Sequence, residues 1–276
     1  MNILSKLSSI VKNNNSLLCV GLDSEFERIP EIMRNKKYPQ YSFNKEIIDA
    51  THEYVCAFKA NSAFYEARGE RGIKELAMTM KYIQKKYSHI VTICDAKRAD
   101  IGNTNKGYVT HIYDNLGFDS VTLHPYLGRE ALQPFLDRKD KACIILCKTS
   151  NPGSGEFQNL KYNGTHLYEY VASQVANEWN INNNCMLVVG ATYPEEMKKV
   201  RAQVGDMPFL IPGIGAQGGI VEETVIAGAN SKKQGMIINS ARDIIFASRG
   251  NKFAFHAGEK ARKLRDEINR YINKLN

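Results

Sequence analysis

The chain has 276 residues, of which 43% are hydrophobic and 24% charged, and its formal net charge is +8. This composition is typical of a folded globular protein and excludes a disordered or low-complexity one. The positive charge suits an anionic partner, but no basic tract is interleaved with aromatic residues. We therefore do not expect a nucleic-acid-binding protein.

The first 15 residues predict an amphipathic helix. They lack the apolar core of a signal peptide and are too short to span a membrane, so we expect a helix that covers part of the fold and no membrane association. A transit peptide is the alternative, disfavoured because the segment contains no arginine. The apolar face of this helix would carry Ile3, Leu4, Leu7, Ile10 and Val11.

Eight short apolar runs follow, and a helix is predicted after each. The runs are continuous rather than alternating, which is typical of strands covered on both faces. They cover residues 17–23, 54–60, a stretch that starts at 90, then 120–125, 142–150, 186–192, 208–213 and 235–240. The predicted helices cover residues 42–52, 69–87, 103–116, 129–136, 165–179, 194–204, 217–227, a short segment after the eighth strand, and 252–275. Residues 25–41 read as an irregular insertion, with Ser42 as the cap of the next helix.

Eight β-α units without a linker or a change of composition predict a closed (β/α)8 TIM barrel. We expect one domain, residues 1–276, with an N-terminal covering helix and a C-terminal helix. A doubly wound open sheet is the rival architecture, disfavoured by eight similar units and a terminal covering helix. In a barrel, the active site lies at the C-terminal ends of the strands.

The cysteines and histidines indicate no metal site. The cysteines all fall in apolar runs without a Cys-x-x-Cys pair, and the histidines lack zinc-site spacing. We interpret the cysteines as small buried hydrophobic residues in a reducing, cytoplasmic compartment. They are Cys19, Cys56, Cys94, Cys143, Cys147 and Cys185.

Charged residues are densest in residues 90–104, at the end of the third predicted strand. Side chains alternate along a strand, so Asp95 and Lys97 share a face, and Asp100 follows where the strand should end. An ammonium between carboxylates would stay protonated and would be available as a proton donor. The alternative is a purely structural network of ion pairs.

The residues at all the predicted strand ends form a larger set, most of them polar. Each taken alone reads as a solvated loop charge, but a barrel would bring all of them to one mouth. The set is Asp23, Lys59, Asp95, Lys97, Asp100, His124, Ser150, Pro212, Gln217 and Arg242.

Residues 212–219 are rich in glycine and contain Gly213-x-Gly215-x-x-Gly218. A dinucleotide fingerprint is excluded because the acidic residue required about 20 positions later is missing. A phosphate cradle fits better, since barrels often bind phosphate in the loops after strands seven and eight. Arg242 would add a fork of donors. A tight turn with a helix cap is the alternative.

These motifs resemble the orotidine 5′-phosphate decarboxylase family, which converts orotidine monophosphate to UMP and carbon dioxide in the last step of de novo UMP biosynthesis. The resemblance covers nearly the whole chain. Its signature is Asp95-Ala96-Lys97-Arg98-Ala99-Asp100-Ile101, supported in the family's order by Gly21-Leu22-Asp23, Phe58-Lys59-Ala60-Asn61, Leu123-His124-Pro125-Tyr126, Lys148-Thr149-Ser150-Asn151 and Pro212-Gly213-Ile214-Gly215-Ala216-Gln217.

The resemblance implies a role for each matching catalytic residue. Lys97 would protonate C6 of the pyrimidine as carbon dioxide leaves, and Asp95 would lie near the departing carboxylate. Lys59 would bridge Asp95 and the ribose, and Asp23 would bind ribose hydroxyls. Activity would need no cofactor and no metal.

The resemblance also implies substrate-binding residues. Ser150 would contact the pyrimidine edge, and Gln217 and Arg242 would hold the phosphate, in motifs that include Pro212 and Ala241. Relatives often carry glycine at the position of Ala241, so this chain departs from the family's pattern in the last phosphate-binding motif.

A homodimer with two shared sites is implied as well, because Asp100, Ile101 and Thr104 would reach into the partner's site. Two other functions stay open at this point. One is a magnesium-dependent sugar-phosphate enzyme of the same barrel superfamily, which shares the Asp-x-Lys-x-x-Asp array. The other is a non-catalytic nucleotide-binding or RNA-binding protein.

Overall fold

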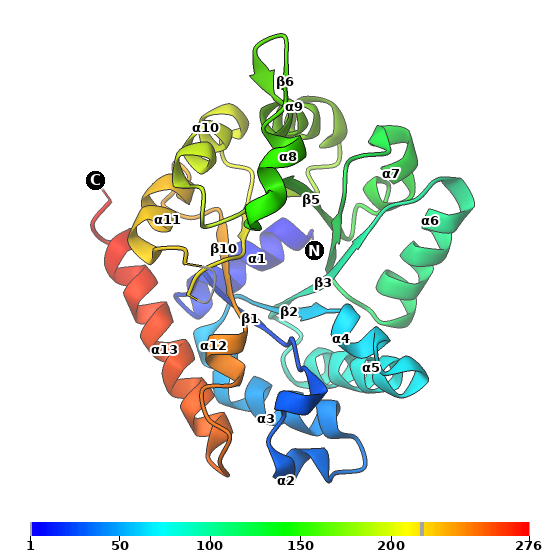
Figure 1. The fold of residues 1–276 in the computed structure, drawn as a ribbon, viewed down its shortest axis with the longest axis vertical. Coiled ribbons are helices and arrows are strands. Elements are labelled where there is room, and N and C mark those ends of the chain that lie inside the picture. The colour runs from blue at the N-terminus through cyan, green and yellow to red at the C-terminus, as the bar shows by residue number, and fades with distance from the viewer. Residues whose placement is uncertain (1, 216–217, 276) are drawn as a thin grey trace.

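The computed structural model describes residues 2–215 and 218–275. Eight parallel strands close into a barrel in the order β1-β10-β9-β8-β5-β4-β3-β2, which confirms the predicted architecture (Figure 1). The strands of the barrel are β1 Leu18–Gly21, β2 Ala57–Asn61, β3 Val91–Arg98, β4 Ser120–Leu123, β5 Ala142–Lys148, β8 Cys185–Val189, β9 Phe209–Ile211 and β10 Met236–Ser240.

Helices surround the ring of strands (Figure 1). The longer ones are α3 Pro39–Thr51, α5 Gly69–Lys86, α6 Gly102–Val109, α7 Gly128–Leu136, α9 Leu167–Gln174, α10 Pro194–Val204, α11 Val221–Gly228 and α13 Phe253–Ile272. Single-turn helices are α2 Glu31–Arg34, α4 Ala63–Glu66, α8 Gly155–Gln158 and α12 Arg242–Ile245, with 3₁₀ turns at η1 Phe26–Arg28, η2 His52–Tyr54 and η4 Pro152–Ser154. None of the helices in the described part of the chain is long and apolar enough to cross a membrane.

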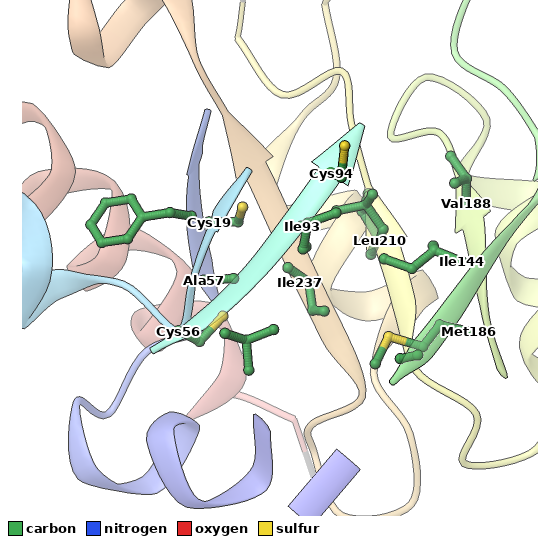
Figure 2. Close-up of a cluster of buried hydrophobic side chains, with 14 of the residues drawn as sticks. Cys19, Cys56, Ala57, Ile93, Cys94, Ile144, Met186, Val188, Leu210 and Ile237 are labelled. Carbon is green, nitrogen blue, oxygen red and sulfur yellow. The ribbon is translucent and has the colours of Figure 1, made fainter. Parts of the chain in front are cut away.

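The core is built from the apolar runs on the strands. Figure 2 shows side chains from several strands, such as Ile93, Leu210 and Ile237, gathered in one cluster. All six cysteines are buried and unpaired, as expected for small hydrophobic residues. Burial raises the pKa of Cys56 and of Cys185 to about 12, so these thiols stay protonated.

The N-terminal helix α1, Ile3–Asn13, covers one end of the barrel. Lys6 forms an ion pair of 2.7 Å with Asp119, just before β4, and the Asn14 side chain donates to the carbonyl of Val55, just before β2. Both partners precede strands, so α1 covers the N-terminal end of the barrel; the sequence predicted a covering helix but not which end it covers. Its buried face consists of Ile3, Leu7 and Ile10.

Some predicted boundaries are wrong. The helix expected from Ser42 begins at Pro39, whose ring fixes a helical φ at a first-turn position. Residues 25–41, expected to be irregular, contain η1, α2 and this first turn. The strand expected from residue 54 begins at Ala57, because the three residues before Val55 form the turn η2.

The helix expected over residues 165–179 is divided. Its first two residues belong to a hairpin of β6 Lys161–Tyr162 and β7 Thr165–His166, which continues into α9 and then the π-helix η5 Val175–Trp179. The helix expected over residues 103–116 likewise passes from α6 into the π-helix η3 Thr110–Asn115. The helix expected from Gln217 starts at Val221, and Gln217 itself lies outside the described residues.

Candidate active site

A cavity of about 480 Å³ opens at the C-terminal ends of the barrel strands. Its walls include residues from β2, β3, β4, β5 and the loops that follow β9 and β10. Eight of the predicted site residues line it, namely Asp23, Lys59, Asp95, Lys97, Ser150, Pro212, Ala241 and Arg242.

Two lysines and two aspartates form an alternating array along one wall. Lys59 Nζ lies 3.4 Å from Asp23 Oδ1 and 3.0 Å from Asp95 Oδ2, and Lys97 Nζ lies 2.6 Å from Asp95 Oδ1. The Lys59 side chain is 4% exposed, whereas the Lys97 side chain is 49% exposed. Lys59 therefore holds the carboxylates in place, and Lys97 presents its ammonium to the cavity.

The array keeps Lys59 and Asp95 charged. Burial opposes ionisation of Asp95, but the charges of Lys59 and Lys97 lower the pKa of this carboxyl well below its usual range. Burial likewise opposes the charge of Lys59, yet Asp23 and Asp95 raise the pKa of its ammonium well above the usual value. The cavity wall thus carries fixed charges of both signs at neutral pH.

The backbone of β3 is irregular where it presents Lys97. The register against β4 shifts between Cys94 and Arg98, and Lys97 has a φ of +46°, a conformation that costs free energy in residues other than glycine. The N–H of Lys97 donates to Thr122 Oγ1 at 3.0 Å, and that hydroxyl donates to Asp95 Oδ1 at 2.9 Å. Thr122 therefore fixes the irregular segment from the neighbouring strand.

Hydrogen bonds link the described glycines of the glycine-rich segment on either side of residues 216–217. Gly213, Gly215 and Gly218 all have positive φ, and the N–H groups of Gly218 and Gly219 donate to carbonyls within the same loop. These two donors are therefore used within the loop, as the alternative interpretation predicts, rather than by an anion. Gly213 still lines the cavity beside Arg242.

Ala241 packs directly over Gly21. A Cβ placed on Gly21 would lie 2.5 Å from the Cβ of Ala241, so a side chain at both positions would clash. The absence of a side chain at residue 21 makes room for the methyl group of Ala241 beside Asp23.

Some predicted residues lie elsewhere. Asp100, Ile101 and Thr104 do not line the cavity of their own chain, and Ile101 is 59% exposed. Asp100 Oδ1 accepts a hydrogen bond from the N–H of Ile101 at 2.7 Å. His124 lines a separate groove between the β4–α7 loop and α9.

Several cavity residues escaped prediction. Thr122 lies within an apolar run of the sequence, so no pattern marks it. In the folded barrel its hydroxyl faces the cavity and donates to Asp95. Others lie at the end of β2, in the loop after β5, at the end of β10 and in α12. The polar cavity residues that were given no role are Asn61, Thr122, Thr149, Asn151, Gln158, Asn239, Ser240 and Asp243, although Asn61, Thr149 and Asn151 belong to the quoted motifs.

Known proteins resemble this chain over nearly its whole length. Orotidine 5′-phosphate decarboxylase of Dehalococcoides mccartyi is 47% identical over 275 residues, and that of Cellvibrio japonicus is 44% identical over 271 residues. Each alignment covers 98% of both proteins.

Solved structures agree as well. Leishmania donovani OMP decarboxylase superposes with a TM-score of 0.86 at 36% identity, covering all of both chains. Leishmania donovani UMP synthase gives 0.88 at 36% identity, but the chain spans only 57% of that longer protein. Residues 16–254 match the model of the Orotidine 5′-phosphate decarboxylase / HUMPS family. The chain therefore belongs to the orotidine 5′-phosphate decarboxylase / HUMPS family.

Proposed function

We propose that this protein decarboxylates orotidine 5′-phosphate to UMP and carbon dioxide, the last step of pyrimidine nucleotide biosynthesis. Its relatives at 42–47% identity carry the name orotidine 5′-phosphate decarboxylase, a carboxy-lyase. The observation that supports this function best is the alternating Asp23–Lys59–Asp95–Lys97 array in the wall of the cavity.

The proton donor in this proposal is Lys97. Loss of carbon dioxide leaves negative charge on C6, a ring carbon without an obvious electron sink. A fixed ammonium near that carbon stabilises the developing charge and then supplies the proton, which forms the new C6–H bond. Asp95, held by Lys59 and Thr122, keeps the Lys97 ammonium in position beside the substrate carboxylate.

The remaining residues bind the nucleotide away from the reacting carbon. Asp23 and Lys59 receive the ribose hydroxyls, and Ser150 meets the pyrimidine edge. Arg242, with Pro212 and Ala241 beside it, holds the phosphate. The Arg242 guanidinium is available for this role, because it has no hydrogen-bond or ion-pair partner among residues 2–215 and 218–275. Gln217, outside the described residues, is assigned to the same phosphate. Binding free energy gained at the phosphate can then organise the charged array.

A homodimer completes the proposed site. Asp100, Ile101 and Thr104 lie outside their own cavity, and the exposed Ile101 side chain is available to a second copy. In the proposal these three residues enter the partner's site, so that each cavity uses both chains. The reaction needs no cofactor, because the ammonium of Lys97 serves as both electrostatic stabiliser and acid.

The decisive assay follows the absorbance of orotidine 5′-phosphate in buffer with a metal chelator. We expect conversion to UMP at the same rate with and without the chelator. The second candidate is a magnesium-dependent sugar-phosphate enzyme, because the matching family model includes the HUMPS proteins as well as the decarboxylases. Activity that the chelator removes, or activity on sugar phosphates only, would contradict the proposal and favour this candidate.

A further inference from the structure

A buried ammonium lies beside the cavity and has no role in the mechanism above. Lys148, the last residue of β5, is 0% exposed. Among residues 2–215 and 218–275, no carboxylate pairs with it; its hydrogen-bond partners are two neutral oxygens. Burial of an unpaired charge is unfavourable, and an apolar side chain of similar length would fill the space at lower free-energy cost.

The ammonium holds together the segment that follows it. Lys148 Nζ lies 3.2 Å from Ser154 Oγ and 2.9 Å from Asn159 Oδ1, near the middle and the end of residues 149–159. It also lies 4.3 Å from the centre of the Tyr193 ring, a cation–π contact with the loop after β8. The Tyr193 hydroxyl donates to the carbonyl of Asn151 at 3.4 Å. One charge thus joins two points of the 149–159 loop to the neighbouring loop, and Tyr193 adds a contact with a third point, Asn151.

The 149–159 loop forms one wall of the cavity. Thr149, Ser150, Asn151 and Gln158 all line it. Gln158 also braces the loop, because its side chain accepts from the Thr149 N–H at 2.9 Å and donates to the Thr149 hydroxyl at 2.8 Å. The position of this wall therefore depends on contacts that surround the buried ammonium.

The loop also packs closely on the end of β8. A Cβ placed on Gly190 would lie 2.7 Å from the Cα of Ser150, and the Gly190 N–H donates to the carbonyl of Lys148 at 2.7 Å. Because of this close approach, a small displacement of the loop would move Ser150 relative to the cavity. Lys148 itself does not line the cavity.

We propose that Lys148 is a positioning residue, whose ammonium fixes the 149–159 loop so that Ser150 and its neighbours meet the substrate. The identity of that substrate rests on the proposed function, but the order of the loop does not. Lys148 makes no contact with reacting atoms, so its loss should weaken nucleotide binding more than it slows turnover at saturation.

The test compares Lys148→Met with the wild-type protein. Methionine keeps the length and apolar character of the side chain but removes the donors. We expect hydrogen–deuterium exchange of the ligand-free variant to rise about tenfold in residues 149–159 and to stay unchanged in the barrel strands. We also expect the Kd of UMP to rise about tenfold, the size of one lost charged hydrogen bond, with a smaller change in kcat.

Arg201→Met is the matched control. Arg201 is a partly buried cation without a carboxylate ion-pair partner in the described chain, and it donates to four carbonyls at the opposite end of the barrel. This variant should lower the Tm without raising the Kd of UMP or the exchange of the 149–159 loop. Its acceptors are the carbonyls of Gly228, Gly205, Met207 and Gly235.

The proposal is overturned if Lys148→Met leaves both loop exchange and the Kd of UMP unchanged, or if Arg201→Met raises them equally. Should Lys148→Met fail to fold, the double variant Ser154→Ala/Asn159→Leu removes the two acceptors instead and must loosen the same loop. If the wild-type protein neither binds UMP nor decarboxylates the nucleotide, the proposed function fails, while the exchange comparison still decides the role of Lys148.

Discussion

Lys97 holds its ammonium 2.6 Å from Asp95 on a backbone whose φ is +46°. The charged array is thus built at an irregular point of β3, where the strand leaves its regular register against β4. Strain of this kind persists only where surrounding contacts hold it, and the hydroxyl of Thr122 contacts both residues. The strained backbone at Lys97 lowers the stability of the fold but places the Lys97 ammonium beside Asp95.

The first prediction concerns this strain. Lys97→Gly and Lys97→Ala should both lose decarboxylation, but the glycine variant should be more stable by about 1 kcal/mol, because glycine adopts positive φ without steric cost. Urea unfolding of both variants measures the difference. Equal stabilities would show that the conformation of residue 97 stores no strain.

The second prediction concerns Thr122. Thr122→Val keeps the shape of the side chain but removes the hydroxyl between Asp95 and the N–H of Lys97, so kcat/KM should fall by about tenfold or more. Steady-state kinetics measure the change. Thr224→Val is the control, since the buried Thr224 hydroxyl has no hydrogen-bond partner in the described part of the chain and its removal should leave kcat/KM unchanged. Equal effects of the two substitutions would contradict the role of Thr122.

The third prediction concerns pH. The pKa of Asp95 is lowered in the folded protein, so its ionised form stabilises the fold above the usual carboxyl pKa, and this contribution is lost as pH falls below about 4. Asp95→Asn should lower the free energy of unfolding by about 3 kcal/mol, because buried Lys59 loses one of its two carboxylates. This loss should be the same at every pH between 5 and 8. Denaturant unfolding across this range measures the difference. A difference that changes steadily from pH 5 to 8 would mean that Asp95 titrates in that range.

The fourth prediction concerns the shared site. Lys97→Ala and Asp100→Ala subunits should each be inactive alone, and an equal mixture after subunit exchange should recover roughly a quarter of the wild-type activity, since half of the dimers would hold one intact site. Size-exclusion chromatography establishes that a dimer forms, and differently tagged subunits establish exchange. Absence of recovery in exchanged dimers would place Asp100 outside the partner's site.

The fold was predictable because each barrel strand is a continuous apolar run. Runs such as residues 186–192 indicate burial on both faces, and eight of them separated by helices leave few architectures. Boundaries were less predictable where two local signals compete. Pro39 starts α3 three residues before Ser42, although both residue types favour a helix start.

The charged part of the site was also predictable, because Asp23, Lys59, Asp95 and Lys97 end strands that meet at one mouth. The role of Thr122 was not, since its contacts depend on a register shift that no local pattern encodes. The same holds for Lys148, whose partners are brought to it by the folded loop. Asp100 does not line the cavity of its own chain, so its predicted role depends on the site of a second copy.

The proton at C6 tests the central claim most directly. Orotidine 5′-phosphate is incubated in D₂O with the wild-type protein and with Lys97→Ala, and the nucleotide product is examined by NMR. We predict UMP that carries deuterium at C6 from the wild-type protein and no turnover by the variant, whose fold is checked by circular dichroism. Near-normal formation of deuterated UMP by a folded Lys97→Ala would contradict the assignment of Lys97 as the proton donor.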